Sequence, residues 1–140
     1  MSKKSANIAA LIEGCRGQDR DAHYLGYFEC FNRKLYYEAH DVLEELWMMD
    51  RKGPNGAFYK GLIQLTGAFV HLQKDRLRPS ARLFRMARAN LEPYAPTHEG
   101  LDIQRVVALI DDWHGRLEAT DLATNPLTTE NAPRLSITEA

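Results

Sequence analysis

The chain has 140 residues, of which 44% are hydrophobic and 26% are charged, and its 18 Lys and Arg against 19 Asp and Glu leave a formal net charge of -1. These values predict one ordinary folded domain and exclude a natively disordered chain. A nearly neutral chain has no global field that would draw it onto nucleic acid or an anionic membrane, so we expect neither as a partner.

The first 18 residues are polar and contain Gly14 and Gly17, which predicts a flexible segment with a short helix over residues 6–13. The apolar run in this segment is too short for the core of a signal peptide, and no stretch of the chain approaches the length of a membrane span. Cys15 and Cys30 form neither a Cys-x-x-Cys motif nor a disulfide framework. We therefore expect a soluble cytoplasmic protein.

The ordered domain is expected over residues 19–118, where apolar positions recur at spacings of three and four. This periodicity predicts helices over 19–31, 35–49, 58–73, 79–91 and 106–117. Short turns join the first helix to the second and the third to the fourth. The fold class is therefore predicted to be all-α, a single-domain bundle of about five helices built from two helical hairpins plus a closing C-terminal helix.

The helix over 58–73 is apolar almost all round, which indicates that other helices cover most of its surface and that it lies at the centre of the bundle. The stretch 94–100 is expected to be a loop, and no strand pattern is seen. Residues 119–140 are rich in Ser, Thr, Asn and Pro, which predicts an extended or partly disordered tail that drapes over the bundle or over a neighbouring subunit.

Polar residues lie beside the apolar faces of the two central helices. On the helix over 35–49, His40 and Glu44 are neighbours at i and i+4, at the edge of the apolar arc. On the helix over 58–73, Gln64 and His71 follow one line with small residues between them. Because a short connection makes these helices antiparallel neighbours, the two sets are expected to face each other. We call these four residues the polar seam.

Acidic residues gather on another face of the helix over 35–49, where Glu38, Asp41 and Glu45 form a strip roughly opposite the apolar arc. This strip and the residues around the polar seam supply the candidate binding residues, which are Tyr37, Glu38, Asp41, Trp47, Lys60 and Gln64.

Two interpretations of the polar seam follow from its chemistry. In the favoured one it is structural, with His40 bonded to Glu44 and Gln64 bonded to a hydroxyl or backbone group, so that buried polar atoms are satisfied. In the alternative, His40, Glu44 and His71 are catalytic and hold a divalent Zn, Mn or Fe ion or an activated water, as in a metal-dependent hydrolase. The chain has no His-Glu-x-x-His motif and no Glu-x-x-His pair of the di-iron type.

A run of basic residues precedes and enters the fourth helix, comprising Lys74, Arg76, Arg78, Arg82, Arg85 and Arg88. Binding of phosphate or nucleic acid through this run is a second alternative. No glycine-rich cradle or stacking aromatic residue accompanies it, so a solvated helix face, or a counterpart to the acidic strip across a dimer, is favoured. The Asp111-x-x-His114 pair is likewise explained by a solvated face beside the core residue Trp113.

Residues 31–47, which read FNRKLYYEAHDVLEELW, together with residues 61–65 and His71, resemble the domain of unknown function 309 family. The resemblance covers about residues 24–91 and implies an all-helical bundle, but no established activity. Asp41 stands where the family commonly has Glu, and Asp75 and Arg76 stand where it usually has a Gly-Asn turn. The function we expect is that of a binding or interaction module that forms a homo-oligomer, with its small-molecule ligand, if any, unknown.

Overall fold

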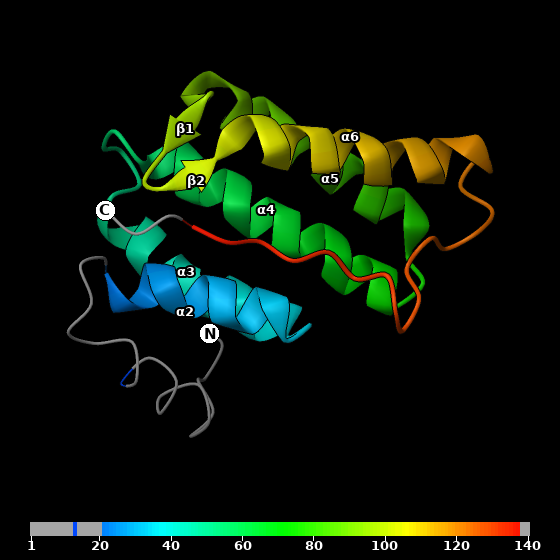
Figure 1. Cartoon of the computed structure of the whole chain (residues 1–140), viewed down its shortest axis with the longest axis horizontal. Coiled ribbons are helices and arrows are strands. Elements are labelled where there is room, and N and C mark those ends of the chain that lie inside the picture. Colours follow the sequence, from blue (N-terminus) through cyan, green and yellow to red (C-terminus); the bar gives the residue numbers. More distant parts are fainter. Residues whose placement is uncertain (1–12, 14–20, 138–140) are drawn as a thin grey trace.

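The computed structural model describes Glu13 and residues 21–137. Its helices and strands, in chain order, are α2 (Ala22–Asn32), α3 (Tyr36–Met49), α4 (Gly56–Gln73), α5 (Leu77–Leu91), the 3-10 helix η1 (Glu92–Tyr94), β1 (Thr97–His98), β2 (Leu101–Asp102) and α6 (Ile103–Ala119) (Figure 1). The all-α class is confirmed, and the described residues form five α-helices packed as expected. The short helix expected over 6–13 lies outside the described residues apart from Glu13.

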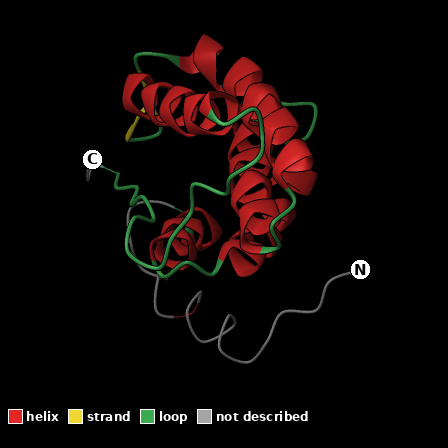
Figure 2. Cartoon of the chain, turned by 90° about the vertical axis from the view of Figure 1, so that its right-hand side faces the viewer, coloured by secondary structure: helices red, strands yellow, loops and turns green. Residues whose placement is uncertain are grey.

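The helices pack as neighbours in chain order. α2 pairs with α3, α4 pairs with α5, α3 also packs on α4, and α6 covers α5. Figure 2 shows the result as an arc of helices that is open on one side. The antiparallel hairpins thus meet where α3 packs on α4, and in Figure 1 α4 lies between α2 and α3 on one side and α5 and α6 on the other.

Phe69 on α4 is the centre of the core and explains why this helix is apolar almost all round. Its ring stacks on Tyr36 of α3 at 5.1 Å between centroids and meets Phe84 of α5 edge-on at 5.4 Å. It also contacts Phe31 of α2 at 5.7 Å and Trp113 of α6 at 5.1 Å. One side chain therefore touches all four other helices, and the expectation that the third helix is central is confirmed.

Three helices end in the same way, and none of them uses glycine. α2, α4 and α6 are each followed by a residue with positive φ, namely Lys34 at 64°, Asp75 at 56° and Asp121 at 52°. After α4, the N–H of Asp75 donates to the carbonyl of Leu72 at 3.0 Å, and that of Arg76 donates to the carbonyl of His71 at 2.8 Å. This pair of bonds is the Schellman motif.

The segment over 94–100 is not only a loop, which corrects the expectation that no strand is present. Thr97 pairs with Asp102 and His98 with Leu101 in a small antiparallel hairpin. Its two turn residues, Glu99 and Gly100, have φ of 49° and 73°, as a tight hairpin turn requires. The strands are too short to show an alternating pattern in the sequence.

Residues after α6 run back across the open side of the arc, between α6 and α2 in Figure 1. Asn32 holds this segment with two bonds: its Nδ2 donates to the Leu135 carbonyl, and its Oδ1 accepts from the Leu135 N–H, both at 2.7 Å. Leu135 is 5% exposed and belongs to the core. None of the described helices is long and apolar enough to cross a membrane.

Candidate functional site

Three residues of the polar seam, His40, Gln64 and His71, lie around one groove between α3, α4 and α5. The groove has a volume of about 320 Å³, and its other lining residues are Tyr37, Ile63, Gly67, Val70 and Leu83. Its floor is α4, because α3 and α5 pack on either side of that helix. The groove is therefore mainly apolar, with polar groups from α3 and α4 at its edge.

Gln64 has a structural partner in this groove. It is 7% exposed, and its Oε1 accepts a hydrogen bond from Asn90 Nδ2 of α5 at 2.7 Å. The expected partner was a hydroxyl or a backbone group, so the structure replaces it with a second amide. Sequence reasoning missed Asn90, although a polar residue directly before the core residue Leu91 was a usable signal.

His71 differs from Gln64 because one of its buried atoms is unsatisfied. Its Nδ1 is buried and has no hydrogen-bond partner among the described residues. Burial lowers the pKa of His71, and the nearby cations Arg76 and Lys74 lower it further. The imidazole is therefore held towards its neutral form, in which one ring nitrogen donates and the other accepts.

His40 does not make its expected bond to Glu44. Its Nδ1 lies 3.4 Å from Asp41 Oδ1, and its ring stacks at 6.4 Å between centroids on the ring of Tyr37. Tyr37 and Asp41 are thus the neighbours of the ring, and Glu44 does not line the groove. This is a correction to the sequence interpretation, and it arises because an i, i+4 spacing permits a contact without determining the rotamer.

No group of three or more His, Cys, Asp or Glu side chains that could hold a metal ion occurs within residues 13 and 21–137. His40 and His71 share the groove, but the third proposed ligand, Glu44, is not at its surface. The divalent-metal hypothesis therefore has no ready-made centre in this part of the chain.

The acidic strip of α3 is less open to solvent than its place opposite the apolar arc would predict. Asp41 is only 9% exposed, and Glu45 Oε2 lies 2.8 Å from His23 Nε2 of α2. Packing of α2 against α3 explains the difference, because it covers part of this face. Of the remaining candidates, Trp47 lies under the guanidinium of Arg51 at 5.8 Å, and Lys60 is exposed.

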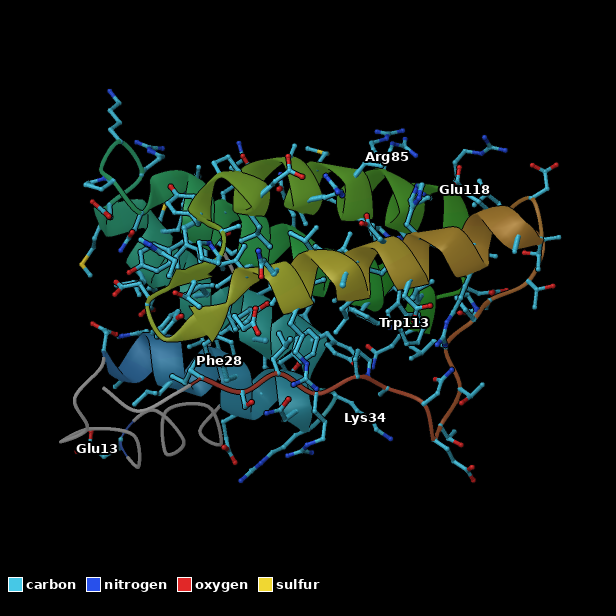
Figure 3. The ribbon with its side chains drawn as sticks, turned by 45° about the horizontal axis from the view of Figure 1, so that its top comes forward. Glu13, Phe28, Lys34, Arg85, Trp113 and Glu118 are labelled. Atoms are coloured by element: carbon cyan, nitrogen blue, oxygen red, sulfur yellow. The ribbon has the colours of Figure 1, made fainter. Side chains whose placement is uncertain are left out.

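Two of the arginines of α5 contact α6 of the same chain. Arg88 Nε donates to Asp111 Oδ1 at 2.8 Å, and Arg85 Nη1 lies 3.3 Å from His114 Nε2. Figure 3 shows Arg85 pointing away from the bundle, whereas Trp113 is 2% exposed. The structure thus agrees with a solvated face at these positions. The acidic partner of Arg88 is Asp111 on α6 of the same chain, not a residue of another subunit.

The fold and the groove define a small all-α bundle in which two adjacent helices, α3 and α4, carry a partly apolar surface. Residues 24–83 match the family model described as domain of unknown function (DUF309), which confirms the resemblance over that range. No curated protein and no solved structure matches the chain. Every residue that lines the groove, from Tyr37 to Leu83, lies inside the matched range.

Proposed function

We propose that this protein is a binding module that self-associates through the groove and the two helices beside it. The observation that carries the proposal is where the exposed large hydrophobic side chains lie. Among the described residues they are Tyr37 at 55%, Met48 at 56% and Met49 at 74% exposed on α3, and Met86 at 41% exposed on α5. Tyr37 lines the groove itself, and the three methionines lie on the two helices that flank α4.

The chemistry of this face suits a contact between proteins. Isolated exposed apolar residues are ordinary, but several of them on the helices that form a groove favour an interaction surface. Methionine adapts its shape to a partner, and an aromatic side chain such as Tyr37 can enter the groove of the other copy. In a two-fold dimer each copy presents the same patch, so Tyr37 of each copy meets the groove of the other.

Charges on the flanking helices are compatible with such self-pairing. α3 carries Glu44, and α5 carries Arg82, which is exposed and has no ion-pair partner among the described residues. A two-fold axis that places α3 of one copy near α5 of the other brings opposite charges together. These ion pairs would fix the relative position of the two copies more than they would raise the affinity of the dimer.

Light scattering coupled to size-exclusion chromatography tests the proposal. At micromolar concentration the protein should elute as a dimer, and Tyr37→Glu or Met86→Glu should convert it to a monomer because each places a charge in an apolar contact. Ala108→Glu, on the exposed side of α6, is the matched control and should leave the dimer intact. A wild-type protein that is monomeric would contradict the proposal.

Charge reversal gives a sharper second test. Glu44→Arg and Arg82→Glu should each weaken the dimer, and the double variant should recover most of the loss because the pair is restored with opposite signs. If the losses of dimer stability in the double variant were additive, this arrangement of the two copies would be excluded. The Tyr37→Glu result would still decide whether the groove face forms the dimer contact.

A further inference from the structure

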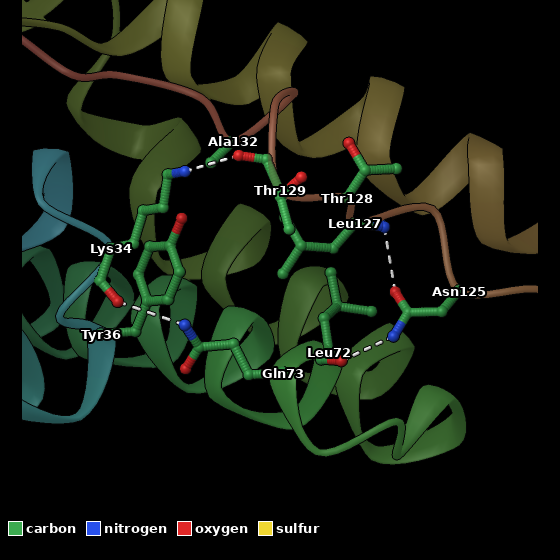
Figure 4. Close-up of a pocket in the computed structure, with 9 residues that line it drawn as sticks. All are labelled: Lys34, Tyr36, Leu72, Gln73, Asn125, Leu127, Thr128, Thr129 and Ala132. Atoms are coloured by element: carbon green, nitrogen blue, oxygen red, sulfur yellow. Dashed lines mark hydrogen bonds between the residues drawn. The ribbon is translucent and has the colours of Figure 1, made fainter.

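A second cavity, of about 470 Å³, lies where the start of α3 and the end of α4 meet the segment after α6 (Figure 4). Lys34 and Tyr36 line one side, Leu72 and Gln73 of α4 line another, and Asn125 and Leu127 belong to the covering segment. None of its lining residues belongs to the groove described above. It therefore needs an explanation of its own.

The wall formed by the C-terminal segment is held in place by hydrogen bonds. Asn125 Nδ2 donates to the Leu72 carbonyl at 2.6 Å, and Lys34 Nζ donates to the Thr129 carbonyl at 2.7 Å. Gln73 Nε2 donates to the Lys34 carbonyl at 3.2 Å and ties the end of α4 to the turn before α3. The dashed lines in Figure 4 show these contacts around the cavity. These hydrogen bonds hold the C-terminal segment against the helices and so fix the shape of the cavity.

Tyr36 is the unusual residue of this cavity. Its side chain is 1% exposed, and its hydroxyl has no hydrogen-bond partner among the described residues. Figure 4 shows the hydroxyl on the same side of the cavity as the Lys34 side chain. Burial raises the pKa of Tyr36 to about 12, so the hydroxyl keeps its proton and remains a donor. A buried donor without an acceptor is rare in folded proteins.

The remaining lining atoms indicate what the missing acceptor is. No acidic side chain lines the cavity, whereas Lys34 brings an ammonium group with three protons, of which one is used on Thr129. Leu72, Leu127 and the ring of Tyr36 supply apolar surface beside these donors. The volume lies in the range of small-molecule pockets.

We propose that this cavity binds a small organic anion whose acidic group accepts hydrogen bonds from the Tyr36 hydroxyl and the Lys34 ammonium. The apolar part of the ligand lies against Leu72 and Leu127, and the C-terminal segment forms the outer wall of the site. This site is independent of the proposed self-association, because the two surfaces share no residue.

A pair of fluorescent probes tests both parts of the proposal on the full chain. Anilinonaphthalene sulfonate carries an anionic group on an aromatic body, and its uncharged parent phenylnaphthylamine lacks that group. The folded protein should bind one sulfonate probe per chain, about tenfold more tightly than the uncharged probe, because a hydrogen bond to a charged group discriminates by about that factor.

The variants decide where and how the probe binds. Tyr36→Phe and Lys34→Gln should each weaken binding of the sulfonate probe about tenfold and leave the uncharged probe unchanged. Lys52→Gln, which changes an exposed lysine outside both the cavity and the groove, is the matched control for Lys34→Gln and should change neither. A thermal melt of each variant shows whether the fold is intact.

Three results would overturn the proposal. The first is a folded protein that does not bind the sulfonate probe below about 1 mM, which is weaker than a formed pocket should allow. The second is equal affinity for the two probes. The third is binding that survives Tyr36→Phe unchanged, since the hydroxyl would then have no role in holding an anion.

Discussion

Two buried tyrosines of neighbouring helices differ in what their hydroxyl groups contact. Tyr27 is 0% exposed and donates to the Leu62 carbonyl at 2.7 Å, whereas Tyr36 is 1% exposed and its hydroxyl has no partner among the described residues. A buried polar group is costly only when it is unpaired. The two residues therefore respond to the same substitution with opposite signs.

Replacing each tyrosine by phenylalanine tests this difference. Without added ligand, Tyr36→Phe should raise the free energy of unfolding by about 1 kcal/mol because an unpaired hydroxyl is removed. Tyr27→Phe should lower it by about 1 kcal/mol because a hydrogen bond is lost. Urea denaturation at neutral pH measures both. A loss of stability in Tyr36→Phe as large as that in Tyr27→Phe would show that the Tyr36 hydroxyl is satisfied.

His71 predicts a pH dependence of stability. Its pKa in the folded state lies below the ordinary value of 6.5, first because of burial and then because of Arg76 and Lys74. The unfolded chain therefore binds the proton first as the pH falls. The stabilising contribution of neutral His71 should be present above pH 6.5 and lost as the pH falls through the folded-state pKa.

Urea denaturation between neutral pH and the acid side of that range, with His71→Gln as the comparison, isolates this contribution. The difference in stability between wild type and variant should change with pH, and the other histidines cancel from it. An NMR titration of the ring protons gives the pKa directly. A value at or above 6.5 would contradict the assignment.

At the scale of elements, the contact between α4 and α5 depends on Gly61. A Cβ built at this position lies 2.7 Å from Leu91 Cγ and 3.1 Å from Asn90 Cβ. The helices are therefore too close here for any side chain. From the sequence, only the small residues between Gln64 and His71 stood out on this helix, and Gly61 did not.

Substitution by alanine at two glycines should give opposite results. Gly61→Ala should lower the free energy of unfolding by about 1–3 kcal/mol because of overpacking. Gly115→Ala, on α6 where nothing lies within 4 Å of the new Cβ, should raise it by about 0.5–1 kcal/mol. Thermal melts of both variants measure the effect. If Gly61→Ala were neutral, the spacing between α4 and α5 would have to be adjustable.

The helix ends show where sequence rules for elements succeed and fail. Pro79 lies in the first turn of α5, as its fixed φ predicts. By contrast, Lys34, Asp75 and Asp121 adopt the left-handed conformation that glycine favours. Only Asp75 carried a sequence signal, because the family has a Gly-Asn turn there. The other two carried no such signal, although the N–H of Lys34 donates to the Phe31 carbonyl at 3.0 Å and that of Asp121 to the Glu118 carbonyl at 2.9 Å.

At the scale of the whole molecule, the C-terminal segment closes the open side of the arc in Figure 2 and is pinned by Asn32. Asn32→Ala removes both bonds to Leu135, so the segment should open more often while the helices stay folded. Amide hydrogen exchange should accelerate over residues 123–137 and stay unchanged in α4, which serves as the internal control. Uniform acceleration throughout the chain would mean that the segment and the bundle unfold together.

The sequence by itself determined the helical class, the order of the five helices, the central place of α4 and the family of residues 24–83. These follow from apolar spacing and local motif, which are properties of adjacent residues. It also placed His40, Gln64 and His71 on the helices that form one groove.

Only the tertiary structure decided the partners of those residues. Asn90 satisfies Gln64, Asp41 and Tyr37 replace Glu44 beside His40, and α2 covers part of the acidic strip. The cavity beside Tyr36 is likewise formed by residues far apart in the chain. The physical reason is that a helical period defines which face a residue occupies, whereas its rotamer and the helix packed opposite it depend on the whole chain.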